Sequence, residues 1–383
     1  MDRKTLSRSQ LREEADRQNA IKKAKQVIAQ AKKPKKSKAR GRRLEQKAAG
    51  LYRLVREWDA DPREVLKVDD HFDVRTFSRD ATPGWSGSKK EAQHVTCTRG
   101  MLLSELQERL FASARGSNTD AVLVILQGMD TAGKGGIVRH VMGMVDPQGV
   151  VLSAFKAPTA EELKYNFLWR ITQRIPTPGL ISVFDRSHYE DLLVPIAQDL
   201  TGHTDEHGRS WRVSDSELER RFHAVQRMEE KAIKRGIRVI KICLLVSYQE
   251  QGKRLRERLD RPDKYWKFSP ADLLTREDWA AHQEAYGKVL KRTSYDEAPW
   301  YVVPADKKWY ARLAVTEILT RELAEIDPQW PPADFDVVHA REALNVTLTP
   351  GALNQWENEL SKKQPHWQAQ NNAVEIAVDA LGS

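Results

Sequence analysis

Residues 121–136 read AVLVILQGMDTAGKGG, and this stretch decides the fold. Its apolar half predicts a buried strand over 121–127, followed by a glycine-rich turn and a helix over about 136–144. Backbone N–H groups of such a turn and the N-terminus of the helix attract an anion, whose oxygens the ammonium group of a lysine can reach. We therefore predict a phosphate-binding loop, and the residues expected to contact phosphate are Gly128, Gly133, Lys134, Gly135 and Gly136.

The loop departs from the general pattern at one position. Gly135 stands where Ser or Thr usually follows the lysine to hold magnesium, and Asp130 inside the loop offers an oxygen ligand instead. A second carboxylate, Asp185, ends the apolar run 180–184, at the place of the second magnesium-site residue in such folds. We predict that Asp130 and Asp185 bind Mg²⁺, with Mn²⁺ as an alternative, and that Arg186 neutralises charge on the transferred phosphoryl group. A helix-capping Asp185 beside a surface arginine is the other interpretation.

Around the loop, short apolar runs alternate with helical stretches. Strands are predicted over 121–127, 150–156, 180–184, 237–246 and 300–303. Helices are predicted over 136–144, 159–174, 215–235 and 248–291, with another after residue 305. Short apolar strands separated by helices form a parallel sheet that is covered on both faces, with ligands beyond the carboxyl ends of the strands. The predicted fold class is α/β: a three-layer αβα fold with a central parallel sheet, a phosphate-binding P-loop and a helical lid.

The other segments are expected to surround this core. Apolar residues at helical spacing predict a helix from Leu44 to Trp58, residues 59–100 read as irregular, and another helix is expected over 102–114. We expect four parts: a basic tail over 1–43, a helical or irregular segment over 44–118, the P-loop domain over 119–332 with its lid at about 253–292, and a peripheral, irregular extension over 333–383.

Charge is distributed unevenly along the 383 residues, whose formal net charge is +9. Residues 1–43 hold 16 Lys and Arg against four Asp and Glu, so the rest of the chain carries a net charge of −3. This tail is either a solvated arm or a weak tether for a polyanion, and without a base-reading motif it predicts only non-specific contact with nucleic acid. Two cysteines are too few for a disulfide framework, and no apolar stretch approaches the length of a membrane helix, so we expect a cytoplasmic protein.

A third cluster, KRLRERLDRPDKYWKFSP over residues 253–270, is strongly basic. Arg254, Arg258 and Arg261 share one helical face, and a proline break follows. A basic, hinged helical segment is typical of a lid that closes over phosphates and excludes water. A charged helix that is merely solvated is the alternative.

These segments together resemble the polyphosphate kinase 2 family over about residues 82–332. The likeness is carried by the loop 128–136 and by five further segments in the same order: FKAPTAEE (155–162), FLWR (167–170), FDRSHYED (184–191), YWKFSPADL (265–273) and APWYVVPAD (298–306). The resemblance implies a thymidylate-kinase-like fold and a magnesium-dependent, reversible phosphoryl transfer between inorganic polyphosphate and AMP or ADP, with guanine nucleotides as further acceptors. It also implies a homodimer or homotetramer.

The resemblance assigns roles to individual positions. Asp130 and Asp185 correspond to the magnesium and catalytic aspartates of the family, and Lys134 and Arg186 correspond to its phosphate ligands. Residues in the wall of the phosphate channel are implied at five further positions: Lys156, Arg170, Arg254, Arg258 and Lys267.

Two groups of residues resemble different subclasses of this family. The HYED, WKF and YVVP segments are similar to the subclass that accepts AMP as well as ADP, whereas Asp185 and Gly135 are similar to the subclass that mainly handles ADP and GDP.

His188 could be interpreted as a general base. A phosphate oxygen is already ionised at neutral pH and needs no base, however, so we favour a structural role for His188. The rival interpretations are an ATP-dependent nucleoside monophosphate kinase and a non-catalytic polyanion-binding protein.

Overall fold

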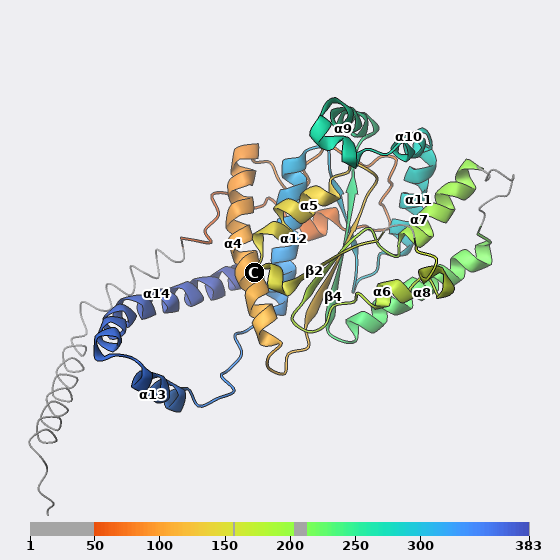
Figure 1. The fold of residues 1–383 in the computed structure, drawn as a ribbon. Helices are drawn as coiled ribbons and strands as arrows, with labels where there is room; N and C mark the ends of the chain where they lie inside the picture. The colour runs from red at the N-terminus through yellow and green to blue at the C-terminus, as the bar shows by residue number, and fades with distance from the viewer. Residues whose placement is uncertain (1–49, 156–157, 203–212, 383) are drawn as a thin grey trace, which may run out of the picture. The chain divides into compact units, whose positions relative to one another are not determined.

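The computed structural model describes residues 50–155, 158–202 and 213–382. Within these residues, five parallel strands form one sheet in the order β2-β3-β1-β4-β5 (Figure 1). The strands are β1 (Ala121–Gln127), β2 (Val150–Ala154), β3 (Ile181–Asp185), β4 (Ile237–Leu245) and β5 (Trp300–Pro304).

Strand β1 lies at the centre of the sheet, and all seven of its residues are buried. Near its carboxyl end, Leu126 pairs with Asp185 of β3 on one side and with Ile242 of β4 on the other. Because parallel strands all end at the same edge, the segments that follow β1, β3 and β4 meet there, where ligands of such sheets bind.

Helices cover both faces of the sheet (Figure 1). On one face, α12 (Lys308–Ile326) packs against α4 (Lys89–Ser113) and α5 (Lys134–His140). On the other face, α7 (Glu190–Thr201) packs against α8 (Asp215–Ile233) and α11 (Trp279–Arg292). Leu123 and Ile125 of β1 share a buried cluster with residues of this second layer, such as Leu192 and Phe222. The predicted three-layer α/β architecture is therefore confirmed.

The lid segment lies between β4 and α11. It consists of α9 (Tyr248–Asp260), the 3-10 turn η4 (Pro262–Lys267) and α10 (Ala271–Glu277), near the end of the sheet where the strands finish (Figure 1). The helical stretch predicted over 248–291 is divided as its proline break implied: Pro262 and Pro270, whose missing N–H groups cannot continue a helix, stand at two of the breaks, and a third break lies at Asp278. The other short elements are α3 (Pro62–Leu66), α6 (Trp169–Thr172), η1 (Met142–Met144), η2 (Pro147–Gly149) and η3 (Glu162–Lys164).

The five predicted strands are confirmed to within a few residues, but several other predictions are wrong. Residues 159–174 form only η3 and α6 in place of one helix. The described part of the helix predicted over 44–58 is not helical, and Trp58 at its end is buried and packs edge-on against Trp85 at 5.5 Å between ring centroids. The stretch 59–100, predicted to be irregular, contains α3 and the first half of α4, which starts with a capping box formed by Ser88 and Glu91.

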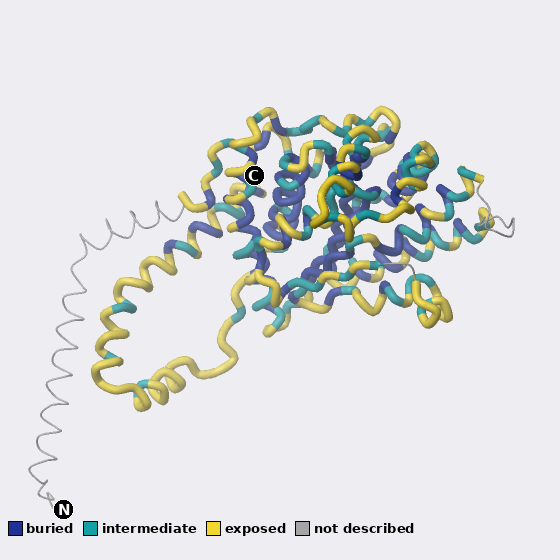
Figure 2. The backbone as a smooth tube through the Cα atoms, turned by 45° about the horizontal axis from the view of Figure 1, so that its top comes forward, coloured by how far each residue is buried: buried dark blue, intermediate teal, exposed yellow. Residues whose placement is uncertain are grey.

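The chain divides into two compact units, residues 1–51 with 342–376 and residues 52–341 with 377–383. The second unit contains the sheet and all the helices that cover it. The described part of the first unit consists mainly of segments of α13 (Val337–Thr347) and α14 (Pro350–Gly382), with side chains that are mostly exposed (Figure 2). The prediction of an irregular extension over 333–383 is therefore wrong for these helices. The basic tail over 1–43 lies outside the described residues.

Among the described residues, no helix combines the length and the apolar character that crossing a membrane requires.

Candidate active site

The loop between β1 and α5 follows a path that requires glycine at its start. Gly128 has a φ of +147°, and a Cβ there would lie 2.6 Å from the carbonyl oxygen of Leu244 on β4. Gly133, with a φ of +122°, is the N-cap residue of α5. A Cβ at Gly135 or Gly136 would meet no atom within 4 Å, so the first turn of α5 leaves free space in front of it. The loop thus exposes backbone, as a phosphate cradle must.

Lys134, the first residue of α5, bends back over its own loop. Its Nζ donates hydrogen bonds to the carbonyl oxygens of Gly128 and Met129, the second at 3.4 Å. Hydrogen bonds between an ammonium group and an anionic oxygen are stronger than those to a neutral carbonyl. A phosphate group that entered the pocket would therefore compete well for Lys134.

Two aspartates lie at the same edge of the sheet. Asp130 accepts a hydrogen bond at its Oδ1 from Arg186 Nη2 at 2.9 Å, and Arg186 follows Asp185, the last residue of β3. Arg186 has a φ of +63°, an uncommon conformation for a residue with a Cβ, and its N–H donates to the carbonyl oxygen of Leu126. Burial disfavours the charge of Arg186, but Asp130 and Glu190 outweigh this effect and raise its pKa.

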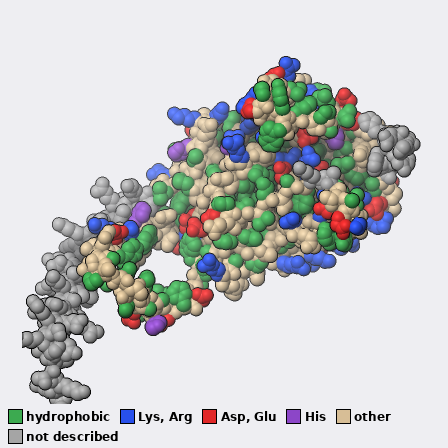
Figure 3. Space-filling model, viewed as in Figure 1, with side chains coloured by type: hydrophobic (Ala, Val, Ile, Leu, Met, Phe, Trp, Pro, Cys, Tyr) green, Lys and Arg blue, Asp and Glu red, His purple; other side chains and the backbone are tan. Residues whose placement is uncertain are grey.

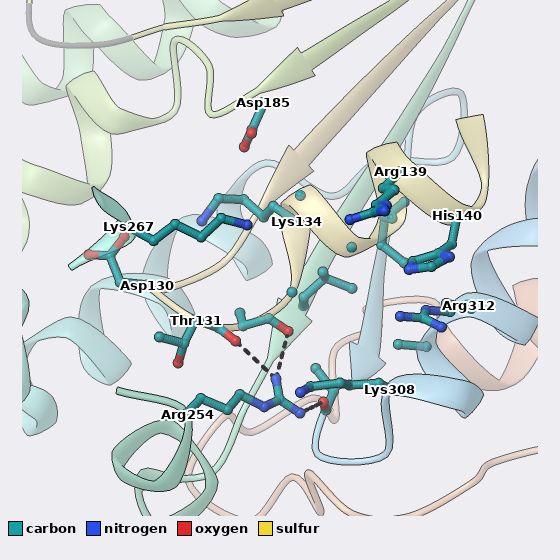
Figure 4. Close-up of a pocket in the computed structure, with 18 of the residues that line it drawn as sticks. Asp130, Thr131, Lys134, Arg139, His140, Asp185, Arg254, Lys267, Lys308 and Arg312 are labelled. Atoms are coloured by element: carbon teal, nitrogen blue, oxygen red, sulfur yellow. Dashed lines mark hydrogen bonds between the residues drawn. The ribbon is translucent and has the colours of Figure 1, made fainter. Parts of the chain in front are cut away.

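The donor set suits a divalent cation. Asp130 and Asp185 both line the pocket, and carboxylate oxygens are the ligands that hard cations such as Mg²⁺ prefer. No side-chain hydrogen bond or ion pair holds the Asp185 carboxylate within the described part of the chain. Figure 4 draws this carboxylate directed into the pocket, on the same side as Asp130. The residues present therefore fit a metal ion at this end.

The pocket in front of the loop has a volume of about 520 Å³ and is strongly basic. Nine Lys and Arg residues line it, against three acidic residues. On the face drawn in Figure 3, Lys and Arg side chains gather beneath the lid near α5. The basic lining residues are Lys134, Arg139, Arg186, Arg254, Arg258, Lys264, Lys267, Lys308 and Arg312. A concave surface with this charge attracts a polyanion.

Four side chains, which we call the cationic wall, stand opposite the aspartates: Arg139 and His140 at the end of α5, and Lys308 and Arg312 one turn apart on α12 (Figure 4). Within the described residues, none of the four makes an ion pair or a side-chain hydrogen bond. Burial, Arg312 and Arg139 lower the pKa of His140, and burial together with Arg254 lowers the pKa of Lys308. The Lys and Arg side chains of the wall therefore carry positive charge that no ion pair within the described residues offsets.

Most of the residues predicted from sequence meet in this pocket. Those that line it are Asp130, Gly133, Lys134, Gly135, Gly136, Asp185, Arg186, Arg254, Arg258 and Lys267. Gly128 lies just before the pocket-lining part of the loop. Arg170 lies on α6 instead, with its Nη1 3.6 Å from Glu162 Oε2 and its guanidinium over the ring of Phe155. Lys156 lies outside the described residues.

Sequence reasoning missed the cationic wall and Lys264. Arg139 and His140 follow Lys134 within one short helix, and their place along that helix is a local signal that could have found them. Lys308 and Arg312 offered no such signal, because they are about 175 residues from the loop in sequence. Arg258, which was predicted, braces the lid: it donates to the carbonyl oxygen of Lys267 at 2.7 Å and to Asp272 Oδ2 at 3.1 Å.

Behind the site lies a buried ionic cluster, which comprises His188, Tyr189, Glu229, Lys241 and Tyr295. His188 is fully buried, with its Nε2 3.3 Å from Glu229 Oε1, and it does not line the pocket. Lys241 Nζ donates to Glu229 Oε2 at 2.9 Å, to the hydroxyl of Tyr189 at 3.2 Å and to the carbonyl oxygen of Thr293 at 2.6 Å. These contacts support the structural role that we favoured for His188.

The chain is similar to several known proteins. A family model described as polyphosphate kinase 2 matches residues 86–331. An AMP/ADP-polyphosphate phosphotransferase of Meiothermus ruber is 37% identical over 266 residues, which cover 70% of this chain and 94% of the relative. An ADP-polyphosphate phosphotransferase of Rhodopseudomonas palustris is 38% identical over 250 residues, which cover 64% and 83%. The crystal structure of polyphosphate kinase 2 from Arthrobacter aurescens TC1 superposes with a TM-score of 0.71 at 43% identity, covering 77% of this chain and 100% of that chain.

Proposed function

The chain belongs to the polyphosphate kinase 2 family and transfers phosphoryl groups between inorganic polyphosphate and nucleotides, and we propose how its pocket does so. In this proposal, polyphosphate lies along the cationic wall with its terminal phosphoryl group between Lys134 and Arg186. The nucleotide brings its terminal phosphate to the side of Asp130 and Asp185. The observation that supports the proposal is the cationic wall, because Arg139, Lys308 and Arg312 make no ion pair within the described residues and a concave basic surface attracts a polyanion.

The chemistry requires positioning and charge more than a reactive side chain. Phosphoryl transfer spreads negative charge over the equatorial oxygens, so donors that are already in place stabilise it. Lys134 would exchange its loop carbonyls for phosphoryl oxygens, and Arg186, held by Asp130, would donate from the opposite side. The attacking phosphate oxygen is ionised at neutral pH, so no general base is needed. Alignment of two bound anions could contribute roughly 7–11 kcal/mol of the barrier reduction.

A divalent metal ion is part of the proposal. Asp130 and Asp185 would hold it, and when bound it would supply positive charge to phosphate oxygens. We propose Mg²⁺, with Mn²⁺ as an alternative. Removal of the metal with EDTA should abolish turnover, and titration with each ion should restore it; full activity in excess EDTA would contradict this part.

Product analysis tests the donor and the acceptor together. The purified protein is mixed with MgCl₂ and long-chain polyphosphate, and AMP, ADP, GMP or GDP is supplied separately, without ATP. We expect phosphorylated products that depend on polyphosphate. Activity with ATP and AMP alone, without polyphosphate, would support an ATP-dependent monophosphate kinase. A folded protein that is inactive in all tubes would support the non-catalytic interpretation.

The acceptor is proposed to be both AMP and ADP, as the name of the Meiothermus ruber relative says of that protein. The Rhodopseudomonas palustris relative is named for ADP only, so position 185 needs a direct test. In the Asp185→Asn enzyme, surviving activity with a higher AMP/ADP ratio would make Asp185 a specificity residue, whereas loss with both acceptors would make it an essential metal ligand. Gly135→Asp is a second specificity variant, because a Cβ at 135 has room.

Self-association is the last element of the proposal. We propose a homodimer or homotetramer in the cytoplasm, on the strength of the family resemblance. Light scattering after gel filtration measures the mass of the assembly, and a monomer of 43.9 kDa would contradict this part.

A further inference from the structure

The family resemblance implies that Arg254 on α9 lies in the wall of the phosphate channel. In the structure, however, every N–H of its guanidinium group binds an acceptor of the protein itself. The residue is only 6% exposed. Its Nε donates to Glu250 Oε1 at 2.8 Å. Its Nη1 donates to the carbonyl oxygens of Thr131 and Ala132 at 2.9 and 3.1 Å, and its Nη2 to those of Ala305 and Asp306 at 2.7 and 3.0 Å (Figure 4). A guanidinium has five N–H donors, and all five are used.

The carbonyls that Arg254 binds belong to two loops at the edge of the sheet. Thr131 and Ala132 lie in the phosphate loop, between Asp130 and Lys134. Thr131 is β-branched and has a φ of +65°, a conformation that persists only where neighbouring contacts enforce it. Arg254 supplies such a contact directly at this residue.

The second loop links the residues bound by Arg254 to the base of the lid. Ala305 and Asp306 follow β5, and Asp306 Oδ1 accepts a hydrogen bond at 2.7 Å from the N–H of Ser247, the N-cap residue of α9. On the same helix, Gln251 Nε2 lies 3.4 Å from the carbonyl oxygen of Asp130. Gln251 and Arg254, one turn apart on α9, therefore both bind the phosphate loop, at the consecutive residues 130, 131 and 132.

We propose that Arg254 is a positioning residue and not a phosphate ligand: it locks the phosphate loop to the base of the lid helix and thereby fixes Asp130 and Lys134 for the reaction. The inference rests on the proposed function of the pocket. Since no N–H of the guanidinium is left over, binding of a phosphate by Arg254 would require breaking a bond that holds the loop. The charge of Arg254 still adds to the positive potential of the pocket.

Arg254→Lys is the variant that separates the two roles. Lysine keeps the charge but has three donors on one atom, so it cannot bridge both loops. We expect kcat to fall about a hundredfold, because small displacements of catalytic groups have effects of this size, while KM for polyphosphate changes little. Arg256→Lys is the matched control, since Arg256 is an exposed arginine of α9 that pairs only with Asp260, and it should behave as wild type.

Two further readouts distinguish positioning from ligand binding. The salt dependence of KM for polyphosphate counts ionic contacts, by analogy with other polyanions, and its slope should be the same in wild type and Arg254→Lys. Amide hydrogen exchange over residues 128–136 should be faster in the variant without any substrate. This exchange result does not depend on turnover, so it tests the clamp even if polyphosphate proves not to be the donor.

The outcomes are distinct. A large fall in kcat with faster exchange and an unchanged salt slope supports the clamp. An unchanged kcat with a higher KM and a shallower salt slope would overturn it and make Arg254 a phosphate ligand. If Arg254→Lys does not fold, Glu250→Ala removes only the Nε partner; a smaller fall in kcat with faster exchange then supports the clamp, and wild-type values of both overturn it.

Discussion

Two groups of charged side chains, one in the pocket and one behind it, are built in opposite ways. In the pocket, the cationic wall of Arg139, His140, Lys308 and Arg312 makes no ion pair within the described residues. On the other side, the buried ionic cluster pairs Lys241 with Glu229, and neither residue is exposed to solvent. A buried cation that is paired, such as Lys241, forms part of the folded core, whereas a cation that is unpaired and open to solvent is available to a ligand.

Arg254 combines features of the two groups. Its donors are all satisfied, as those of Lys241 are, but four of its five partners are neutral carbonyls. Hydrogen-bond saturation therefore fixes a side chain in place, and only a carboxylate also cancels its charge. Four predictions follow the contrast between the two groups, from the largest expected effect to the smallest.

Glu229→Gln should cause the largest change, because it removes the carboxylate that pairs with the buried Lys241. Breaking a buried ion pair from one side costs about 3–5 kcal/mol of unfolding free energy. Urea denaturation followed by circular dichroism measures the loss. The double variant Glu229→Leu/Lys241→Met is the control and should recover much of the stability, since it removes both charges. A loss below about 1 kcal/mol for the single variant would contradict the role assigned to the cluster.

The pH dependence of stability sharpens the same prediction. Burial alone would raise the pKa of Glu229, but Lys241 and the hydrogen bonds of His188 and Tyr295 outweigh it and lower the pKa to about 2. A carboxyl whose pKa is lower in the folded state stabilises the protein above its unfolded pKa, and this contribution disappears as the pH falls toward its folded pKa. The stability difference between wild type and Glu229→Gln should therefore shrink between about pH 4.5 and pH 2. A difference that stays constant over this window would show that Glu229 is not the group responsible.

Lys134→Ala should have the next largest effect, and on activity alone. Loss of one pre-positioned donor to the transferred group typically lowers kcat about 10²–10³-fold, roughly 3–4 kcal/mol. The melting temperature should stay near that of wild type, since Lys134 contacts only carbonyls of its own loop. Single-turnover kinetics with polyphosphate and ADP measure the effect. Preserved turnover would refute the assignment of this loop to phosphate binding.

Arg312→Ala should weaken polyphosphate binding without a change in stability. An unpaired arginine that contacts one phosphate contributes about 1.4 kcal/mol, so we expect KM for polyphosphate to rise about tenfold. The salt dependence of KM should also become shallower. Arg256→Ala, which removes an exposed and paired arginine of the lid, is the matched control. An equal response of the two variants would mean that pairing does not distinguish the cationic wall from other surface charge.

His140→Gln should have the smallest effect, and only in acid. Because burial, Arg312 and Arg139 lower the pKa of His140, its side chain gains its charge at a lower pH than an ordinary histidine does. Equilibrium binding of polyphosphate should therefore strengthen more between pH 7.5 and pH 5.5 in wild type than in the variant. Parallel pH profiles would remove His140 from the polyphosphate site.

The amino-acid sequence by itself determined the central layer of the fold and one end of the site. Strand β1, the glycine loop and Lys134 form a continuous local pattern, and Asp185 and Arg186 directly follow a second apolar run, so strand and loop propensities were enough to find them. The ends of the strands agree to within a few residues because a buried parallel strand is a short, uninterrupted apolar run. Trp58, by contrast, fitted a helical spacing, but the described residues before it are not helical, and its ring is buried against Trp85, which lies 27 residues further along the chain.

Only the tertiary structure decided which charged side chains are free in the pocket and which bind other groups of the protein. Arg254 and Arg258 look equivalent in sequence, one helical turn apart, but Arg254 saturates its donors on the phosphate loop and Arg258 braces the lid. Nothing in the sequence around Lys308 and Arg312 indicates that they line the pocket; they do so because α12 packs next to α5 in the fold. The physical reason is that a side chain's role depends on which donors and acceptors lie within about 3 Å of it, and those come from segments far apart in the chain.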